Sequence, residues 1–173
     1  MTELKQKQAN PTDLTFAFER LKNEHICLYN AIHQLENKAK LLNKIERPAE
    51  YVSKLADLRD QALSVIAELD NHSKWEDNEL FPLLTEYFQL PDRPHTTTSL
   101  WMLEHEHELA NLFFGYFLDE ADICLAQQKR PSCSGLTDQL LQACRLVKEH
   151  LQTEEETMLP LEEELFMDTD AVI

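Results

Sequence analysis

The 173-residue chain is poor in glycine, in basic residues and in long apolar runs. Two glycines and no alternating strand pattern favour long helices with few tight turns. Lysine and arginine number 16 against 32 acidic residues, which gives a net charge of −16. Nucleic acid and acidic membrane surfaces are excluded as partners because both need basic patches. The longest apolar run, residues 112–118, is too short to span a bilayer.

Cysteine is also scarce, and its spacing shows no C-x-x-C motif. The four cysteines are Cys27, Cys124, Cys133 and Cys144. The polar N-terminus has no apolar signal core. We therefore expect reduced thiols and a cytoplasmic protein.

Apolar residues recur at alternating steps of three and four through four long segments, the pattern of helices packed in a bundle. The first segment follows a helix start signal at Pro11, and the second begins near Pro48. The third follows a connection over residues 89–99, with a cap near Ser99, and the fourth follows a loop at residues 130–135. On the third segment we assign the inward seam to Trp101, His105, Leu109, Leu112 and Tyr116.

These segments predict an all-α fold, an antiparallel up-down-up-down four-helix bundle. We expect one domain over residues 12–167, between a flexible tail at 1–11 and an acidic tail at 168–173. The run at residues 112–118 is apolar all round its helix, so a homodimer is compatible with the sequence.

A His-x-x-x-Glu motif occurs twice in near-duplicate surroundings, at His72–Glu76 and at His150–Glu154. Each copy has a second acid at +5 from its histidine and Pro-Leu at +10 and +11. A Glu-His dipeptide precedes each copy, at residues 24–25 and 104–105. The resulting set lies on the predicted seams and comprises His25, His72, Glu76, His105, His150 and Glu154.

Residues four apart share one face of a helix, so each motif presents two ligands to one point. A buried unpaired carboxylate is costly, and a bound metal removes that cost. Four imidazoles with two carboxylates suit first-row transition metals better than Mg²⁺ or Ca²⁺. Two carboxylates can bridge two ions, which leaves about two histidines and an open coordination position for each.

The same residues are compatible with several alternatives. A single metal ion, zinc, or packing without metal would also fit these residues. Asp77 or Glu155, the acids at +5, could replace Glu76 or Glu154 as a bridge. The remaining nearby titratable residues are assigned to the solvent-exposed surface: Glu24, His33, His95, Glu104 and His107.

The repeated motif with its following apolar-Pro sequence resembles the hemerythrin-like family of His-His-Glu cation-binding domains, from about Asp13 to Leu165. Within this family the chain looks most like the subfamily with four histidines and two glutamates, which resembles the di-iron proteins of iron–sulfur cluster repair. The resemblance implies two non-haem iron ions in an oxo- or hydroxo-bridged centre, with zinc or manganese as alternatives. It implies terminal ligands His25, His72, His105 and His150, and bridging Glu76 and Glu154.

The chain differs from known members of the family in two respects, which limit what the resemblance implies about function. Oxygen-carrying hemerythrins have His-x-x-x-His on the third helix, whereas His105 is followed at +4 by Leu109. The repair proteins carry an additional N-terminal domain with paired cysteines, for which this chain has only a short tail. The expected function is therefore binding of, or reaction with, O₂ or NO in sensing, scavenging or stress protection. A di-iron redox enzyme, an iron donor for cluster repair and a metal-free interaction module are the alternatives.

Overall fold

The protein was analysed as a computed structural model that describes the backbone of residues 10–89, 94–129 and 135–170. Side chains are described for residues 10–89, 107–129 and 135–167. Within these ranges the chain is all-α and contains no strand, as predicted.

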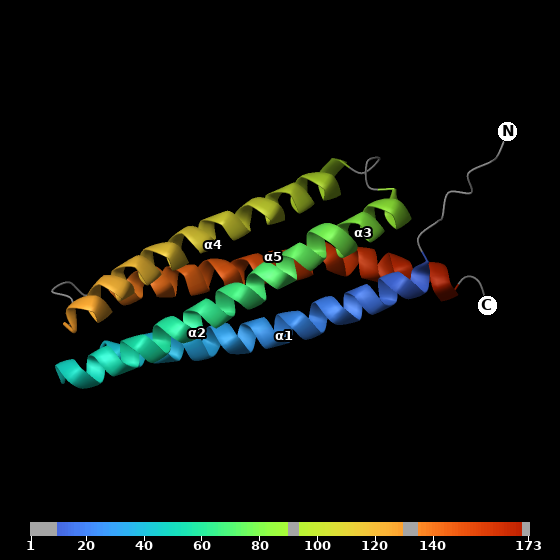
Figure 1. Cartoon of the computed structure of the whole chain (residues 1–173). Helices are drawn as coiled ribbons and strands as arrows, with labels where there is room; N and C mark the ends of the chain where they lie inside the picture. Colours follow the sequence, from blue (N-terminus) through green and yellow to red (C-terminus); the bar gives the residue numbers. More distant parts are fainter. Residues whose placement is uncertain (1–9, 90–93, 130–134, 171–173) are drawn as a thin grey trace.

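Long helices run up and down in alternation and form a four-rod bundle (Figure 1). The first rod is α1 (Pro11–Leu42), and the second joins α2 (Pro48–Trp75), the π-helical turn η1 (Glu76–Leu80) and α3 (Phe81–Phe88) without a break. The third and fourth rods are α4 (Pro94–Gln127) and α5 (Leu136–Asp170). Helix α1 packs on α2 and α5, and α4 packs on the same two neighbours.

The rods begin and end at residues suited to helix termini. The side chain of Asn10 accepts a hydrogen bond from the backbone N–H of Thr12 (3.1 Å), and proline occupies the first turn of α1 and of α2. Helix α4 begins at Pro94, earlier than the predicted cap near Ser99, because proline is also accommodated in a first turn. Gln89 and Gln128 adopt left-handed backbone angles at two C-terminal ends, the role that glycine usually has.

The two copies of the repeated motif differ in backbone geometry where their prolines lie. In the second rod, the N–H of Phe81 bonds to the carbonyl of Glu76, five residues earlier, which widens the helix into the π turn η1. Pro82 follows this turn, and the rod ends at Phe88. The equivalent Pro160 lies inside α5. The π turn therefore belongs to the first copy, at the position of Glu76.

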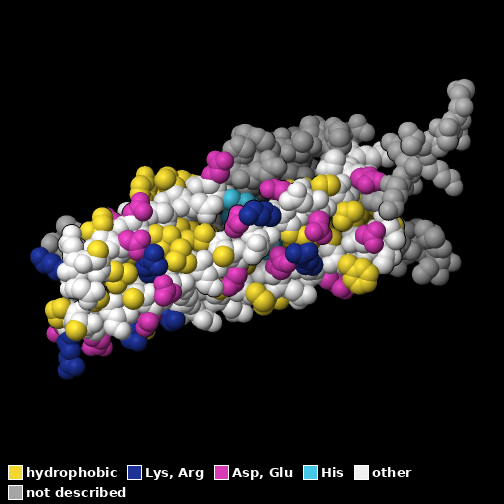
Figure 2. Space-filling model, viewed as in Figure 1, with side chains coloured by type: hydrophobic (Ala, Val, Ile, Leu, Met, Phe, Trp, Pro, Cys, Tyr) yellow, Lys and Arg dark blue, Asp and Glu magenta, His cyan; other side chains and the backbone are white. Residues whose placement is uncertain are grey.

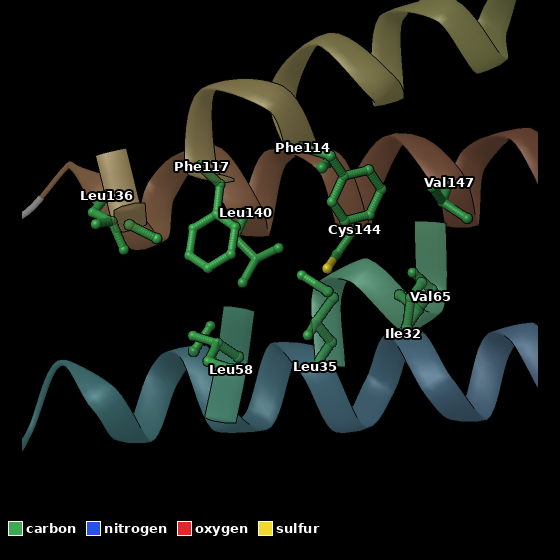
Figure 3. Packing of buried hydrophobic residues seen from close by; sticks show 14 of the residues in the cluster. Ile32, Leu35, Leu58, Val65, Phe114, Phe117, Leu136, Leu140, Cys144 and Val147 are labelled. Carbon is green, nitrogen blue, oxygen red and sulfur yellow. The ribbon is translucent and has the colours of Figure 1, made fainter. Parts of the chain in front are cut away.

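The apolar core is divided into two clusters along the length of the bundle. The larger cluster includes Leu35, Leu58, Phe114, Phe117 and Leu140, which pack together from four helices (Figure 3). The smaller cluster, at the other end, includes Phe18, Trp75, Leu84 and Leu161. Each fully buried leucine or phenylalanine contributes about 1.5–3 kcal/mol relative to an exposed position.

The seam predicted for the third rod was wrong. Leu109, Leu112 and Tyr116 have 47%, 48% and 50% of their surface exposed. A different set, offset along the same helix, faces the core: Ala110, Phe114, Phe117, Ala121 and Cys124. Both sets repeat at steps of three and four, so periodicity alone cannot choose between them. Trp101 and His105 lie outside the described side chains.

The surface carries charges of both signs along the rods, with acidic residues in excess (Figure 2). Ion pairs tie neighbouring helices together, such as Glu36 of α1 with Lys148 of α5 at 2.6 Å and Lys22 with Glu162 at 2.5 Å. Among the described residues, no helix has the length and apolarity needed to span a membrane.

Candidate metal centre

A polar layer of histidine and glutamate separates the two apolar clusters. His25 comes from α1, His72 from α2, Glu76 from η1, and both His150 and Glu154 from α5. None of these five side chains has more than 3% of its surface exposed. They lie on the same helical seams as the leucines above and below them, because the three-and-four spacing that builds the core also carries these residues inward.

The ligand-type atoms of this layer converge at the centre. His72 Nε2 lies 2.9 Å from Glu76 Oε1, and His25 Nε2 lies 3.2 Å from Glu154 Oε2. The same Glu154 oxygen lies 3.8 Å from His150 Nε2 and 4.0 Å from His72 Nε2. The geometric expectation for a histidine and a glutamate four residues apart therefore holds for both motifs.

The third rod contributes His107 to this layer. The rings of His107 and His150 are 4.1 Å apart between centroids. The prediction that His107 lies on the surface was wrong, because it rested on the outer seam of α4. His107 continues the inner seam, three residues before Ala110 and seven before Phe114. The side chain of His105, the predicted ligand, lies outside the described residues.

The sequence holds little that distinguishes His107 from His105, and the difference appears in the burial of the residues that follow each. Glu106-His107 is a Glu-His dipeptide just as Glu104-His105 is, so the duplication does not separate them. The apolar residues at +3 and +7 from His107 are Ala110 and Phe114, which are both buried. The corresponding residues after His105 include the half-exposed Leu109 and Leu112.

The described ligand-type atoms form two groups that share one carboxylate. One group comprises His25, His72, Glu76 and Glu154, and the other comprises Glu76, His107 and His150. Within each group the atoms lie within 4.8 Å of one another. Such spacing allows each group to surround one ion, with Glu76 positioned to contact both.

Two carboxylates outside the layer support its histidines. His72 Nδ1 donates to Glu24 Oε2 at 2.7 Å, and His25 Nδ1 donates to Glu155 Oε1 at 2.9 Å. Glu24 was expected to be solvated, but it is 30% exposed and pairs across the helix interface. The sequence alone could not predict this role of Glu24, because it depends on how α1 and α2 pack against each other.

The acids at +5 do not lie among the central atoms. Glu155 is 47% exposed and meets the outer nitrogen of His25, and Asp77 is exposed within η1. Glu76 and Glu154 are 1% and 0% exposed, with their carboxylates inside the layer. The geometry thus favours the acids at +4 over those at +5 as central ligands.

Burial and mutual repulsion push the two central carboxyl groups apart in acidity. Burial, followed by the nearby Glu154 charge, raises the pKa of Glu76 well above its ordinary value. Burial would also raise the pKa of Glu154, but its contacts with His25 and Glu76 outweigh this and lower the pKa to about 2. Like charges so close cannot both be held without compensation. Ionisation of Glu76 beside the charged Glu154 is therefore unfavourable unless a cation lies between them.

The pKa values of the four histidines depend on the groups that surround each ring. Burial lowers the pKa of His107 and of His150 to about 4. Burial likewise lowers the pKa of His72. For His25, contacts with Glu154 and Glu155 outweigh burial and raise the pKa. Most of these rings are consequently neutral at pH 7, which is the form that binds a metal ion.

Several buried polar atoms of the layer have no hydrogen-bond partner among the described residues, and these atoms show whether the site fits a metal ion. In the described part of the chain, the Nε2 atoms of His25 and His72 and all four carboxylate oxygens of Glu76 and Glu154 lack a partner of hydrogen-bond geometry. Native proteins rarely bury such atoms unpaired. Imidazole nitrogens and carboxylate oxygens that converge on one point are ligands for transition-metal cations. The residues present therefore fit a metal centre.

A helical bundle with a buried imidazole–carboxylate centre defines a class of cation-binding domain. Comparison with family models agrees, because residues 17–162 match the hemerythrin HHE cation binding domain. The chain belongs to the hemerythrin HHE family. Comparison with curated proteins and with solved structures gave no match.

Proposed function

We propose that this chain is a non-haem di-iron protein that binds or reacts with O₂ or NO, in sensing, scavenging or stress protection. The observation that supports the proposal is the pair of ligand groups that share Glu76 inside a layer of unpaired buried atoms. Four described histidines and two glutamates give an imidazole-rich donor set, which favours iron over Mg²⁺ or Ca²⁺. Zinc and manganese remain alternatives for the same ligands.

The residues of the layer have separate tasks in this proposal. His25 and His72 would hold one ion, and His107 and His150 the other, with Glu76 and Glu154 between the two ion positions. Iron held by these residues would supply redox chemistry with small gas molecules. The apolar clusters on both sides of the layer exclude bulk water from it. Charge on the ions would allow Glu76 and Glu154 to be ionised together.

The test is metal loading followed by optical spectroscopy. The anaerobic metal-free protein is loaded with Fe(II), its iron content is measured, and spectra are recorded before O₂, after O₂ and after O₂ removal. NO is tested separately in the same way. We expect two irons per chain and new near-ultraviolet and visible charge-transfer bands on exposure to a gas. Bands that reverse when the gas is removed indicate a carrier or sensor, and bands that persist indicate redox chemistry.

Matched variants make this test specific to the layer. Glu154→Gln should lower the bound iron and weaken the bands. Glu36→Gln, a buried acid on α1 that pairs with Lys148 instead of the layer, should retain both. Fewer than two irons in the wild-type protein would overturn the di-iron proposal. Equal iron content in both variants would place the metal elsewhere.

A further inference from the structure

Basic side chains without an acidic partner gather at one end of the bundle. Acidic residues outnumber basic ones two to one in this chain, and most described lysines and arginines form an ion pair. The described basic residues that make no ion pair with another described residue are Lys38, Lys40, Lys44, Arg47 and Lys129. All five lie at the end of the molecule where α1 and α4 finish (Figure 1).

This positive charge is confined to a short part of the sequence. Residues 38–57 hold five of the 16 basic residues of the chain but only three of its 32 acidic residues. The net charge of −16 therefore conceals a basic end, where dark blue side chains stand out at the left of Figure 2. Like charges held together repel one another, so a bound anion would stabilise this end of the bundle.

A cavity with an apolar wall lies among these basic residues. Its volume is about 490 Å³, and Leu41, Leu42 and Ile45 supply its apolar surface. Small-molecule sites usually occupy roughly 300–1,000 Å³, so the cavity has the size of such a site. Leu42 is 2% exposed, whereas Leu41 keeps 58% of its surface exposed. Burial of Leu41 under a ligand would therefore remove apolar surface from water.

The remaining lining residues of the cavity are charged, and three of the four are lysines: Lys38, Lys44, Lys54 and Asp57. Lys54 Nζ lies 3.5 Å from Asp57 Oδ2, so these two charges compensate each other. Lys38 and Lys44 have no such partner in the described part of the chain. The cavity with these seven lining residues, named here the basic pocket, thus combines an apolar wall with two uncompensated ammonium groups.

The basic pocket is separate from the metal layer. Leu41 follows His25 by 16 residues in the same helix, which corresponds to roughly 24 Å along the axis. Large polyanions would meet the acidic remainder of the molecule as well as this end, and that remainder would repel them. A small anion can contact the lysines alone.

We propose that the basic pocket binds a fatty carboxylate, a small molecule with a hydrocarbon chain and a single carboxylate head group. The hydrocarbon chain lies against Leu41 and Ile45, and the carboxylate accepts hydrogen bonds from the ammonium groups of Lys38 and Lys44. One negative charge suffices, because the third lysine is already paired with Asp57. This site is additional to the metal centre and does not depend on the proposed iron chemistry.

The test is an NMR titration of the isotope-labelled full chain with octanoate. We expect saturable shifts in the backbone amide signals of residues 38–57, with a Kd in the millimolar range or below. Acetate has the same head group without the chain, and octylammonium has the same chain with the opposite charge. Neither should bind saturably at the concentrations that saturate the pocket with octanoate. Titration of the metal layer is not involved, because the ligand approaches the opposite part of α1.

Variants of the lining residues assign the two halves of the ligand. Lys38→Gln and Lys44→Gln should each weaken octanoate binding by about two- to fivefold, as expected for an exposed ion pair. Leu41→Ser should weaken it as well, and its exposed position keeps the effect on folding small. Lys40→Gln is the matched control, because Lys40 is exposed on the same helix and has no ion pair with a described residue, but does not line the pocket. Its affinity for octanoate should match that of the wild type.

Three outcomes would overturn the inference. The first is the absence of saturable shifts with octanoate, and the second is octylammonium binding as tight as that of octanoate. The third is an equal loss of affinity in Lys40→Gln and Lys44→Gln, which would show general attraction to the basic end instead of a site. Self-association of the wild-type protein that Lys44→Gln abolishes in sedimentation would assign the pocket to a second copy of the chain, and would overturn it too. None of these outcomes bears on the iron proposal, which metal loading tests separately.

Discussion

Replacement of Glu76 by leucine should stabilise the metal-free protein. Glu76 is 1% exposed, and neither of its carboxyl oxygens has a hydrogen-bond partner among the described residues. Its raised pKa shows that burial opposes its charge. A buried polar group without a partner costs about 1–3 kcal/mol, and a leucine of similar size would remove that cost. For a chain of this length, the gain corresponds to a rise of about 2–12 °C in Tm.

Metal should reverse the sign of this effect. An ion present at about 100 times its Kd stabilises a folded protein by about 2.7 kcal/mol, and a leucine cannot serve as a ligand. Wild-type protein should therefore become more stable than Glu76→Leu when Fe(II) or Co²⁺ is added. The assay is urea unfolding followed by circular dichroism, with EDTA and then with metal under anaerobic conditions.

Glu36→Leu is the control for this prediction. Glu36 is also buried, at 8% exposure, but its carboxylate pairs with Lys148. Loss of that charge-assisted bond offsets the apolar gain, so this variant should show no stabilisation in EDTA and an unchanged response to metal. A metal-free Glu76→Leu protein less stable than the wild type would refute the reasoning. Glu76 would then stabilise the layer instead of straining it.

Three further outcomes are expected. His107→Ala should reduce the bound metal from two ions per chain to one. His105→Ala should have this effect only if the side chain of His105 reaches the layer. Metal analysis of the two variants compares these histidines directly. In the metal-free Glu76→Leu variant, the free energy of unfolding should fall as the pH drops from 6.5 towards 4, by roughly 2 kcal/mol per histidine ring at pH 5. The reason is that His107 and His150 stay neutral in the folded state, with pKa values of about 4, but gain protons in the unfolded state. Equal urea midpoints at pH 7 and pH 5 would contradict this. At pH 8, a thiol reagent should modify the exposed Cys27 quickly but should modify Cys144 only when the protein unfolds. Cys144 is buried, and burial raises its pKa to about 12. Peptide mass spectrometry identifies the modified thiols.

The sequence by itself determined the helical bundle and most of the central layer. Three-and-four spacing places an apolar stripe on each rod, and such stripes can be buried only against one another. His25, His72 and His150 lie on stripes whose other members are mainly apolar residues, so their inward direction followed from periodicity. The two His-x-x-x-Glu motifs needed no tertiary information either, because a helix brings residues four apart together wherever it packs.

Only the tertiary structure decided which side of α4 faces inward. That helix carries two stripes of the same period, one with His105 and Leu109 and the other with His107 and Ala110. Contact with α2 and α5 selects the second, because Phe114 and Phe117 fill the core between these helices. The bonds from Glu24 to His72 and from Glu155 to His25 also required the packed bundle. They join residues on different helices, whose separation along the chain says nothing about their distance in space.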